Sequence, residues 1–409
     1  MEQVIFHIDV NSAFLSWSAL KRLSLGDTVD LREIPSIVGG DIESRHGVVL
    51  AKSIPAKKYG IVTGEPVVNA FRKCPSLIME APDHTLYHQK SRALMQFLTD
   101  ICPEIEQLSI DECFMNFTPI SHLYCSPVEA AEEIKNKIRT DFRFTVNIGI
   151  SDKKILAKMA SDFTKPDKVH TLFTNQIQEK MWPMPVSSLY MCGKSSAQVL
   201  NKLGIRTIGE LAGTDKNILI SHLKSHGILL WEYANGIDHT TVNPVPSEAK
   251  GVGNSTTLPH DVTQMQEACS YLRSLADQVA SRLRISNQFA SMVSVEIKYS
   301  DFQTASHQKM ISTATNTSQI IYETSCQLFQ ELWNGSPIRL LGIRTTKLTD
   351  DCEPAQLSLF DFERPTVSAA TPSAAKLAAL DETLDSIRKK YGDSAVIRGS
   401  LLKDKPPKD

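Results

Sequence analysis

The order of apolar patterns over the first 160 residues restricts the possible folds more than any other feature of this sequence. Val4, Phe6 and Ile8 alternate with polar residues, which is typical of a strand that ends at Asp9. The patterns that follow predict, in order, helix 14–20, apolar β-rich segments 34–38 and 47–51, helix 84–101, strands 105–110 and 113–117, helix 128–138, strand 144–150 and helix 155–159. This order indicates a split βαβ arrangement, in which an antiparallel sheet carries helices on one face.

The remainder of the chain changes character twice. Short helical patterns with glycine turns run from 181 to 235. Beyond them the sequence predicts a second α+β domain, with helices 264–285 and 319–333 and strands 291–299, 308–313 and 339–348. After Asp350 the composition shifts to Ser, Ala, Thr and Pro, which indicates a linker. The fold class expected for these 409 residues is therefore multidomain α+β.

The charge of the chain bears on its partners. With 44 Lys and Arg against 46 Asp and Glu, the formal charge is -2, whereas nucleic-acid binders usually have a basic surplus. The average hides a local surplus, because residues 152–224 hold eleven Lys and Arg against six Asp and Glu. Such a stripe suits sequence-independent binding to phosphates, and a solvated helix face is the alternative.

Cysteine usage and hydropathy indicate the compartment. No apolar run approaches the roughly 18 residues of a membrane span, and the start MEQVIFHIDV lacks a basic region followed by an apolar stretch. The eight cysteines form no CxxC pair and no zinc-type cluster. We therefore expect a cytoplasmic protein with reduced thiols and no membrane partner.

Three carboxylates are the candidate catalytic groups. Asp9 lies at a strand end, and Asp111 and Glu112 occupy the apex of the expected hairpin in SIDECF. Adjacent residues of a regular strand point to opposite faces, so this pair can serve one site only where the strand ends. Converging carboxylates repel one another unless cations lie between them, and such oxygen ligands suit Mg²⁺. The alternative is that Asp9 caps a helix and that the pair forms a solvated turn.

Several motifs extend this interpretation. HIDVNSAF, SIDECF and LAKMASDFTKPD, in this order and at this spacing, resemble the catalytic motifs of the Y-family DNA polymerases, and within these translesion enzymes the polymerase IV branch is the most similar. AKSIPAKKYGI resembles the fingers of this family, LGIRTIGELA and LLWEYANGID resemble its thumb, and KGVGNSTTLPHDV resembles the start of its little finger. The resemblance covers roughly residues 1–350.

The resemblance implies an enzyme of several domains. The expected bounds are 1–21 and 81–170 for the catalytic palm, 22–80 for the fingers, 171–241 for the thumb with a helix-hairpin-helix, 248–347 for the DNA-binding little finger and 348–409 for the tail. The implied function is template-directed DNA synthesis by a low-fidelity DNA-directed DNA polymerase that bypasses damaged template bases in DNA repair. Its substrates are primer-template DNA and dNTPs, and we expect a monomer.

The resemblance also implies a metal site. Asp9 and Asp111 match the family's metal ligands, and the adjacent Glu112 completes the site. The carbonyl of Val10 is the expected backbone ligand. The implied cofactor is two Mg²⁺ ions, of which one lowers the pKa of the primer 3′-hydroxyl and the other neutralises charge on the triphosphate and pyrophosphate.

The nucleotide pocket follows from the same motifs. Phe14 matches the steric-gate position, where a bulky ring excludes a 2′-hydroxyl, and the alternative is a helix residue packed in the core. The small residues Ser12 and Ala13 beside it are compatible with an open site. Lys165 in TKPD matches a family lysine that contacts the triphosphate.

The fingers depart from the family pattern. Where the family usually has Tyr and, three positions on, Arg, this sequence has Ile54 and Lys57. Arg grips phosphate bidentately whereas Lys is a point charge, so we expect weaker nucleotide affinity with preserved chemistry. Lys52 or Lys58 can compensate, and the alternative is that each is a solvated charge.

MCGKSSAQVLNKLGIRTIGEL resembles a helix-hairpin-helix, whose glycine-rich turn presents N–H groups to a DNA phosphate. The usual hairpin has two glycines two residues apart. Here Met191 replaces the first, which leaves Gly193 and Lys194 as the candidate DNA contacts. A simple packed helix pair is the alternative.

The tail contains two further features. Gln356, Leu357, Leu359 and Phe360 in QLSLF resemble the anchors of the pentapeptide that binds the bacterial sliding clamp. Beyond it, an apolar stripe predicts a helix that either docks back on the body, as we expect, or binds a partner. The stripe comprises Leu377, Leu380, Leu384, Ile387 and Tyr391.

Two other functions compete with a polymerase. A nucleotide cyclase is suggested by GGDIE at 39–43, which resembles the diguanylate cyclase signature GGDEF but does not fall on the expected palm hairpin. A non-catalytic DNA-binding or clamp-associated scaffold needs the tail and thumb but no carboxylates.

Overall fold

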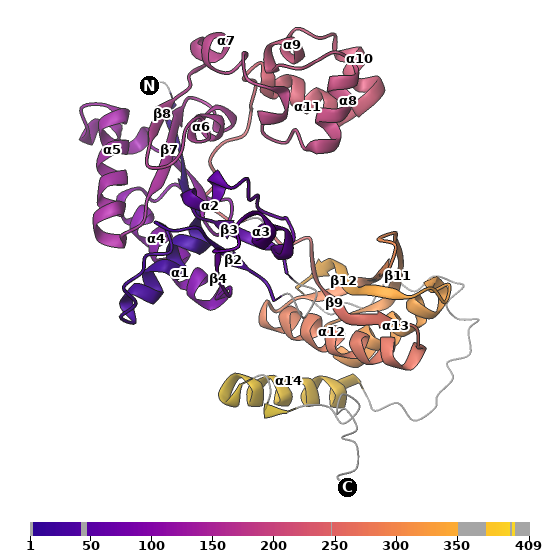
Figure 1. Cartoon of the computed structure of the whole chain (residues 1–409). Helices are drawn as coiled ribbons and strands as arrows, with labels where there is room; N and C mark the ends of the chain where they lie inside the picture. Colours follow the sequence, from indigo (N-terminus) through magenta and orange to yellow (C-terminus); the bar gives the residue numbers. More distant parts are fainter. Residues whose placement is uncertain (1–2, 42–46, 247, 351–373, 393–394, 397–409) are drawn as a thin grey trace. The chain divides into compact units, whose positions relative to one another are not determined.

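The computed structural model describes residues 3–41, 47–246, 248–350, 374–392 and 395–396. These residues form two compact units, one ending at Pro246 and the other beginning after residue 247 (Figure 1). Each unit has its own sheet and hydrophobic core, which confirms the multidomain α+β fold class. Among the described helices, none has the length and apolar character needed to span a membrane.

The first unit is built on a five-stranded sheet with strand order β5-β6-β1-β7-β8. Its strands are β5 (Ile105–Gln107), β6 (Glu112–Asn116), β1 (Ile5–Val10), β7 (Val146–Ser151) and β8 (Val169–Thr171). The central β1 is antiparallel to both β6 and β7, and β8 is parallel to β7. Pairing on both edges fixes the backbone of β1 up to its last residues, where the expected site begins.

Helices cover both faces of this sheet, so the prediction of helices on one face is wrong. One face carries α1 (Ala13–Ser24), α4 (His84–Ile101) and α5 (Pro127–Lys137), whose apolar side chains share a core with those of β1 and β6. On the other face α6 (Lys154–Ser161) packs against β1 and β7. Gly149 permits this close crossing, because a Cβ there would lie 2.0 Å from the carbonyl oxygen of Ala157.

The Gly- and Pro-rich stretch between α1 and α4 forms a small sheet of order β3-β2-β4 with two helices. Its elements are β2 (Ser36–Gly39), β3 (Val49–Lys52), α2 (Ile54–Lys58), α3 (Val67–Lys73) and β4 (Ile78–Glu80). Ser53 caps α2, since the Ala56 N–H donates to its Oγ at 3.0 Å. This cap fixes the angle at which α2 leaves β3.

The last part of the first unit is helical, as predicted. It contains α7 (Ile177–Lys180), α8 (Lys194–Lys202), α9 (Ile208–Ala212), α10 (Lys216–Leu223) and α11 (Ser225–Ala234). Its core includes Leu156 and Met159 of α6, so α6 is shared between the sheet and this helical region. Gly204 and Gly236 adopt positive φ in its turns.

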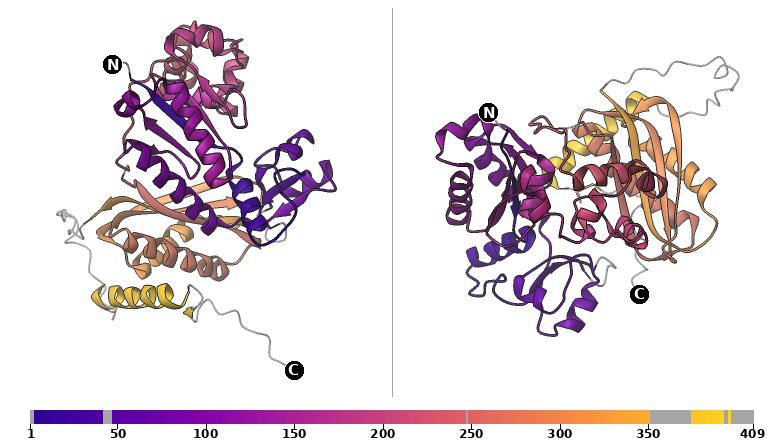
Figure 2. Two further views of the ribbon diagram at one scale, coloured as in Figure 1. Left: turned by 90° about the vertical axis from the view of Figure 1, so that its left-hand side faces the viewer. Right: turned by 90° about the horizontal axis from the view of Figure 1, so that it is seen from above.

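The second unit contains a four-stranded antiparallel sheet of order β11-β10-β12-β9. Its strands are β9 (Gly251–Val262), β10 (Phe289–Tyr299), β11 (Thr304–Thr315) and β12 (Ile338–Thr349), and α12 (Met265–Ile285) and α13 (Ser318–Leu332) pack on one face (Figures 1 and 2). Both predicted helices and all three predicted strands are confirmed. β9 was not predicted as a strand.

The C-terminal helix α14 (Ala374–Tyr391) docks on the second unit, as we expected. The centre of the contact is polar: Asp381 accepts hydrogen bonds from the N–H (2.8 Å) and Oγ (2.7 Å) of Ser318. Arg284 of α12 pairs with both Asp381 (3.2 Å) and Asp385 (2.7 Å). Leu380, by contrast, is 47% exposed, so the apolar stripe predicted the helix better than it predicted the docked face.

Candidate active site

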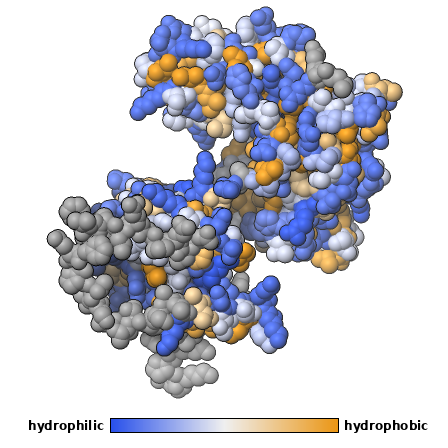
Figure 3. Space-filling view, turned by 180° about the vertical axis from the view of Figure 1, so that it is seen from behind, coloured by the Kyte–Doolittle hydropathy of each residue, from blue (hydrophilic) through white to orange (hydrophobic). Residues whose placement is uncertain are grey.

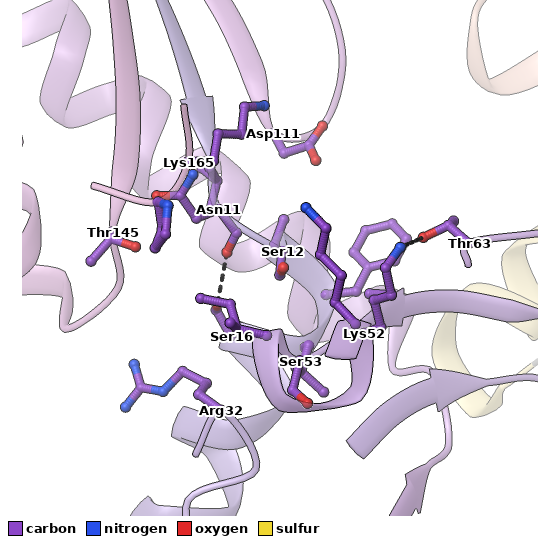
Figure 4. A pocket seen from close by; sticks show the side chains of 18 of the residues that line it. Asn11, Ser12, Ser16, Arg32, Lys52, Ser53, Thr63, Asp111, Thr145 and Lys165 are labelled. Atoms are coloured by element: carbon purple, nitrogen blue, oxygen red, sulfur yellow. Dashed lines mark hydrogen bonds between the residues drawn. The ribbon is translucent and has the colours of Figure 1, made fainter. Parts of the chain in front are cut away.

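A cleft of about 480 Å³ lies in the first unit, beside the end of β1 (Figure 4). Its walls come from the β1–α1 turn, the β3–α2 turn and the loop at 165–166, with Asp111, Thr145 and Arg32 at its margins. Most of the candidate catalytic and nucleotide-binding residues line it: Asp9, Val10, Ser12, Ala13, Phe14, Ile54, Lys57, Asp111 and Lys165. Segments far apart in sequence therefore meet here.

The sheet register brings the acidic residues to one edge. Asp9 pairs with Glu112 across the β1–β6 ladder, and the Val10 N–H donates to the Asp111 carbonyl at 3.0 Å. Directly after β1, Ser12 adopts a left-handed conformation (φ 47°) that turns the chain into α1. This tight turn keeps Asp9 and the start of α1 on the same cleft.

Asp9 is a partly buried carboxylate with a lysine partner. Burial raises its pKa, and an ion pair with Lys165 opposes this rise without cancelling it. Burial lowers the pKa of Lys165, but the nearby charges of Asp9 and Asp162 outweigh it and the net pKa is raised. Lys165 Nζ also lies 2.8 Å from Asp162 Oδ1. The cleft thus holds a carboxylate and an ammonium in direct contact.

Glu112 turns away from the cleft into a buried polar network. His7 Nε2–H donates to its Oε2 at 3.0 Å, and Lys158 of α6 forms an ion pair with the same oxygen. His7 Nδ1 lies 2.8 Å from Ser161 Oγ. The hydrogen bond from His7, helped by the charge of Lys158 and opposed by burial, lowers the pKa of Glu112 to about 2. The lowered pKa of Glu112 favours its ionised form, held by His7 of β1 and Lys158 of α6.

The three carboxylates share a sheet edge but do not surround one point. Asp9 and Asp111 line the cleft, whereas Glu112 does not. Asp111 accepts a hydrogen bond from Ser109 Oγ at 2.6 Å. Within the described ranges, no group of three His, Cys, Asp or Glu side chains lies close enough together to hold a metal ion.

An asparagine pair that sequence reasoning missed supports the Lys165 loop. Asn11 Nδ2 donates to Asn147 Oδ1 at 3.1 Å, and Asn147 Nδ2 donates to the Thr164 carbonyl at 2.7 Å. The Asp167 N–H donates to Asn11 Oδ1 at 2.9 Å. These bonds hold the backbone on both sides of Lys165. A signal was available, because Asn147 is a polar residue between the apolar Val146 and Ile148 of a strand.

Phe14 takes part in both the core and the cleft. Its ring stacks on Tyr87, with centroids 4.4 Å apart and an interplanar angle of 8°. It is also one of the residues that line the cleft, and it is only partly buried. Its neighbour Ala13 is buried, and Ser12 is exposed. The stacking fixes the plane of the ring at the cleft wall.

The small sheet supplies the opposite wall. Ile54, 51% exposed, and Lys57 line the cleft from α2. Lys52, the last residue of β3, lines it as well, and its Nζ donates to Thr63 Oγ1 at 3.3 Å (Figure 4). Lys58 is exposed but is not part of the cleft lining. Of the two lysines considered as substitutes for arginine, only Lys52 faces this site.

The hairpin before α8 forms although its first glycine is missing. Met191 adopts the left-handed conformation (φ 68°) that a glycine there would favour, and its side chain is 49% exposed. Gly193 is the N-cap of α8, and Lys194 is the first helical residue.

The candidate clamp-binding residues Gln356, Leu357, Leu359 and Phe360 lie outside the residues that the structure describes.

The fold and the cleft together define a class of protein. A solved Y-family DNA polymerase chimera of Dbh and Dpo4 matches the structure with a TM-score of 0.74. The match covers 85% of this chain and 100% of that one, at 20% sequence identity. The fold is therefore that of the Y-family DNA polymerases, with palm, fingers, thumb and little finger.

The family follows from the sequence comparisons. Residues 8–162 match the impB/mucB/samB family and residues 249–359 match its C-terminal domain, so the chain belongs to this family. It is 46% identical to DNA polymerase IV of Clostridium acetobutylicum over 402 residues, which covers 98% of this chain and 99% of that protein. It is 34% identical to DNA polymerase IV 1 of Bacillus subtilis over 408 residues, which covers 99% and 95% of the two chains.

These relationships establish a DNA-directed DNA polymerase that performs template-directed synthesis on primer-template DNA with dNTPs.

The cyclase and scaffold alternatives are therefore set aside. The GGDIE segment begins at Gly39, at the end of β2 in the small sheet, whereas Asp111 lies at the hairpin of the large sheet.

Proposed function

We propose that this chain is a translesion polymerase that transfers a nucleotidyl group from a dNTP to the primer 3′-hydroxyl in the cleft beside β1, with two Mg²⁺ ions as cofactor. The observation that carries the proposal is the meeting of Asp9, Asp111 and Lys165 at one cleft. Carboxylates and an ammonium side by side suit a substrate that arrives as an anion with bound cations.

The residues at the cleft fit such a cofactor. Asp9, Asp111 and the Val10 carbonyl would hold it, and all three belong to residues that line the cleft. The contact between the Asp9 carboxylate and the Lys165 ammonium supports this assignment, because this partly buried carboxylate already has a cation as its partner. When bound, the ions lower the pKa of the primer 3′-hydroxyl and neutralise charge on the triphosphate.

Each side chain then has a separate role. Lys165, held by its Asn-supported loop, turns its ammonium from Asp9 to the triphosphate, and Lys57 contacts the triphosphate from α2. Glu112 completes the acidic edge from its network with His7 and Lys158, where its lowered pKa keeps it ionised. Asp9, by contrast, has a raised pKa and is therefore sensitive to the loss of a neighbouring cation.

The wall at the β1–α1 turn determines which sugar and base are accepted. Phe14 acts as the steric gate against a 2′-hydroxyl, and its stacking on Tyr87 supports that role by fixing the ring. Ser12 and Ala13 place little bulk beside it. A nucleotide pocket with small residues tolerates distorted base pairs, which accounts for low fidelity and for bypass of damaged templates.

DNA and the sliding clamp are bound elsewhere on the chain. Gly193 and Lys194 contact a DNA phosphate at the start of α8, supported by the left-handed hairpin at Met191. The QLSLF pentapeptide at 356–360 binds the bacterial sliding clamp. We also propose that the protein is a cytoplasmic monomer. In support of a monomer, hydrophobic side chains are scattered among hydrophilic ones on the face of the described residues in Figure 3.

Domain bounds are part of the proposal: palm 1–21 and 81–170, fingers 22–80, thumb 171–241, little finger 248–347 and tail 348–409. The end of the first compact unit at Pro246 supports a boundary between thumb and little finger near that residue.

Primer extension with purified protein tests the mechanism. Wild-type protein should extend a primer only with Mg²⁺, and Asp111→Ala should reduce the rate on the order of a thousandfold by removing one cleft carboxylate. Asp100→Ala, which changes an exposed aspartate on α4, is the control and should retain full activity. Extension by Asp111→Ala at the wild-type rate would contradict the assignment.

A further inference from the structure

The positive charges around the cleft are not equally compensated. Arg32 donates to both carboxylate oxygens of Asp30, and Lys165 pairs with Asp9 and Asp162. Lys52 and Lys57, by contrast, have no carboxylate within ion-pair distance among the residues that the structure describes. The lysines of the cleft that lack a direct carboxylate partner among the described residues therefore lie on its fingers wall.

Lys52 is held at this wall more firmly than an ordinary surface lysine. It is the last residue of β3 and pairs with Ile37 of β2, so the sheet fixes its backbone. Its side chain is partly buried and extends along the cleft to the neutral hydroxyl of Thr63, 3.3 Å away (Figure 4). Burial first, and then the charge of Lys57, lower the pKa of Lys52, and the charge of Glu65 opposes this without cancelling it. A partly desolvated ammonium near a second one is stabilised when an anion binds between them.

We propose that Lys52 binds the triphosphate of the incoming nucleotide together with Lys57, as a pair of ammonium groups that replaces the guanidinium usual in these polymerases. The inference rests on the proposed function, since it requires the triphosphate to lie in this cleft. A guanidinium offers two parallel N–H donors from one side chain, whereas an ammonium acts as a point charge. Two lysines that approach from β3 and α2 restore two donors at separate positions.

The substitution Lys52→Met tests the proposal, because it keeps the aliphatic stem and removes only the charge. The dNTP dependence of single-turnover incorporation should show a Kd increased about tenfold with an unchanged maximal rate. The conservative variant Lys52→Arg, which keeps the charge, should have a Kd within about threefold of the wild-type value. Lys58→Met is the matched control, because Lys58 lies on α2 but outside the cleft lining, and it should leave the Kd unchanged.

A second measurement separates phosphate binding from a structural role. Inorganic tripolyphosphate should inhibit the wild-type protein competitively against dNTP, and Lys52→Met should weaken that inhibition about tenfold. An unchanged dNTP Kd would overturn the proposal, and so would a loss confined to primer-template affinity. Lack of any Mg²⁺-dependent extension by the wild-type protein would instead contradict the proposed function, so the two failures are distinguishable.

Discussion

Asp9 and Glu112 show how one sheet edge gives two carboxylates different properties. The residues are paired across the β1–β6 ladder, yet burial raises the pKa of Asp9 while His7 and Lys158 lower that of Glu112. The difference arises first from the hydrogen bond that His7 of β1 donates to Glu112, and Lys158 of α6 adds to it, whereas Asp9 is paired with the more exposed Lys165. Environment, more than residue type, therefore divides the roles at this site.

Phe14 packs against the core and also lines the cleft, which leads to a testable prediction. Phe14→Ala removes the ring from the cleft wall, and ribonucleotide incorporation should rise at least about tenfold relative to deoxyribonucleotide incorporation. Single-nucleotide incorporation with matched dNTP and rNTP gives the ratio directly.

Its control removes the stacking partner and keeps the gate. Tyr87→Leu keeps the Phe14 ring but removes the stacking that fixes its plane, so it should lower stability and weaken the exclusion of ribonucleotides less than Phe14→Ala does. If Phe14→Ala still rejects ribonucleotides, Phe14 serves packing alone.

Lys57 gives a second prediction at this scale. Lys57→Arg introduces a bidentate phosphate ligand on α2 and should lower the apparent KM for dNTP about threefold without changing kcat. Steady-state primer extension measures both constants. Lys58→Arg, on the neighbouring exposed position, controls for a general effect of added guanidinium. An unchanged or raised KM would count against contact between Lys57 and the triphosphate.

The sequence predicted some site residues better than others. Asp9 and Asp111 stand at or next to the ends of strands that periodicity identifies, and Lys165 lies in the loop between α6 and β8. The order of the motifs predicted that all three serve one site. Lys158 could not be paired with Glu112 in advance, because this contact depends on α6 crossing the opposite face of the sheet at Gly149. Alternation along β1 gives the face of His7 but not the helix that covers it.

Among the elements, α14 shows a dependence between distant segments. Thr317, the N-cap of α13, makes no side-chain capping bond, and Asp381 of α14 accepts from the Ser318 N–H instead. A carboxylate at a helix N-terminus also interacts favourably with the helix dipole. The start of α13 is thus capped by a helix about sixty residues later in the chain.

Removal of this cap should loosen both helices. Asp381→Ala should destabilise the docked arrangement by about 2 kcal/mol, through loss of the cap and of the pair with Arg284. Hydrogen exchange on the full chain should show faster exchange in the first turn of α13 and along α14. Glu382→Ala, at an exposed neighbouring position, should leave both unchanged. Equal protection in Asp381→Ala and wild type would show that α14 docks by other contacts.

The sequence did not predict strand β9, because few of its side chains are buried. In β9 only Leu258 and Val262 are buried, so its Gly-, Thr- and Asn-rich sequence lacks the alternation that identified β10 and β12. Its pairing with β12 over most of its length supplies the order that its own side chains do not predict. Strand propensity is a weaker guide than the neighbouring strand here.

At the scale of the whole molecule, the formal charge of -2 does not argue against DNA binding, although the composition alone suggests that it does. The acids include Asp9, Asp111 and Glu112 at the active site, and the basic surplus is local to residues 152–224. A surplus of this size predicts weak DNA binding that falls steeply with salt concentration. We expect such an enzyme to dissociate readily from its template, so that the proposed contact with the sliding clamp would keep it there.

The clamp peptide provides the test at this scale. Replacing residues 356–360 with five Gly and Ser residues keeps the length of the segment between β12 and α14 and removes the apolar anchors. The number of nucleotides added per binding event on clamp-loaded templates should fall to the value measured without clamp. Distributive synthesis on the same templates should be unchanged, because the cleft and both compact units are intact. The gain is expected to grow with salt, since the clamp contact does not depend on phosphate while the DNA contact does. Retention of the full gain by the replaced chain would show that the clamp is bound through another surface.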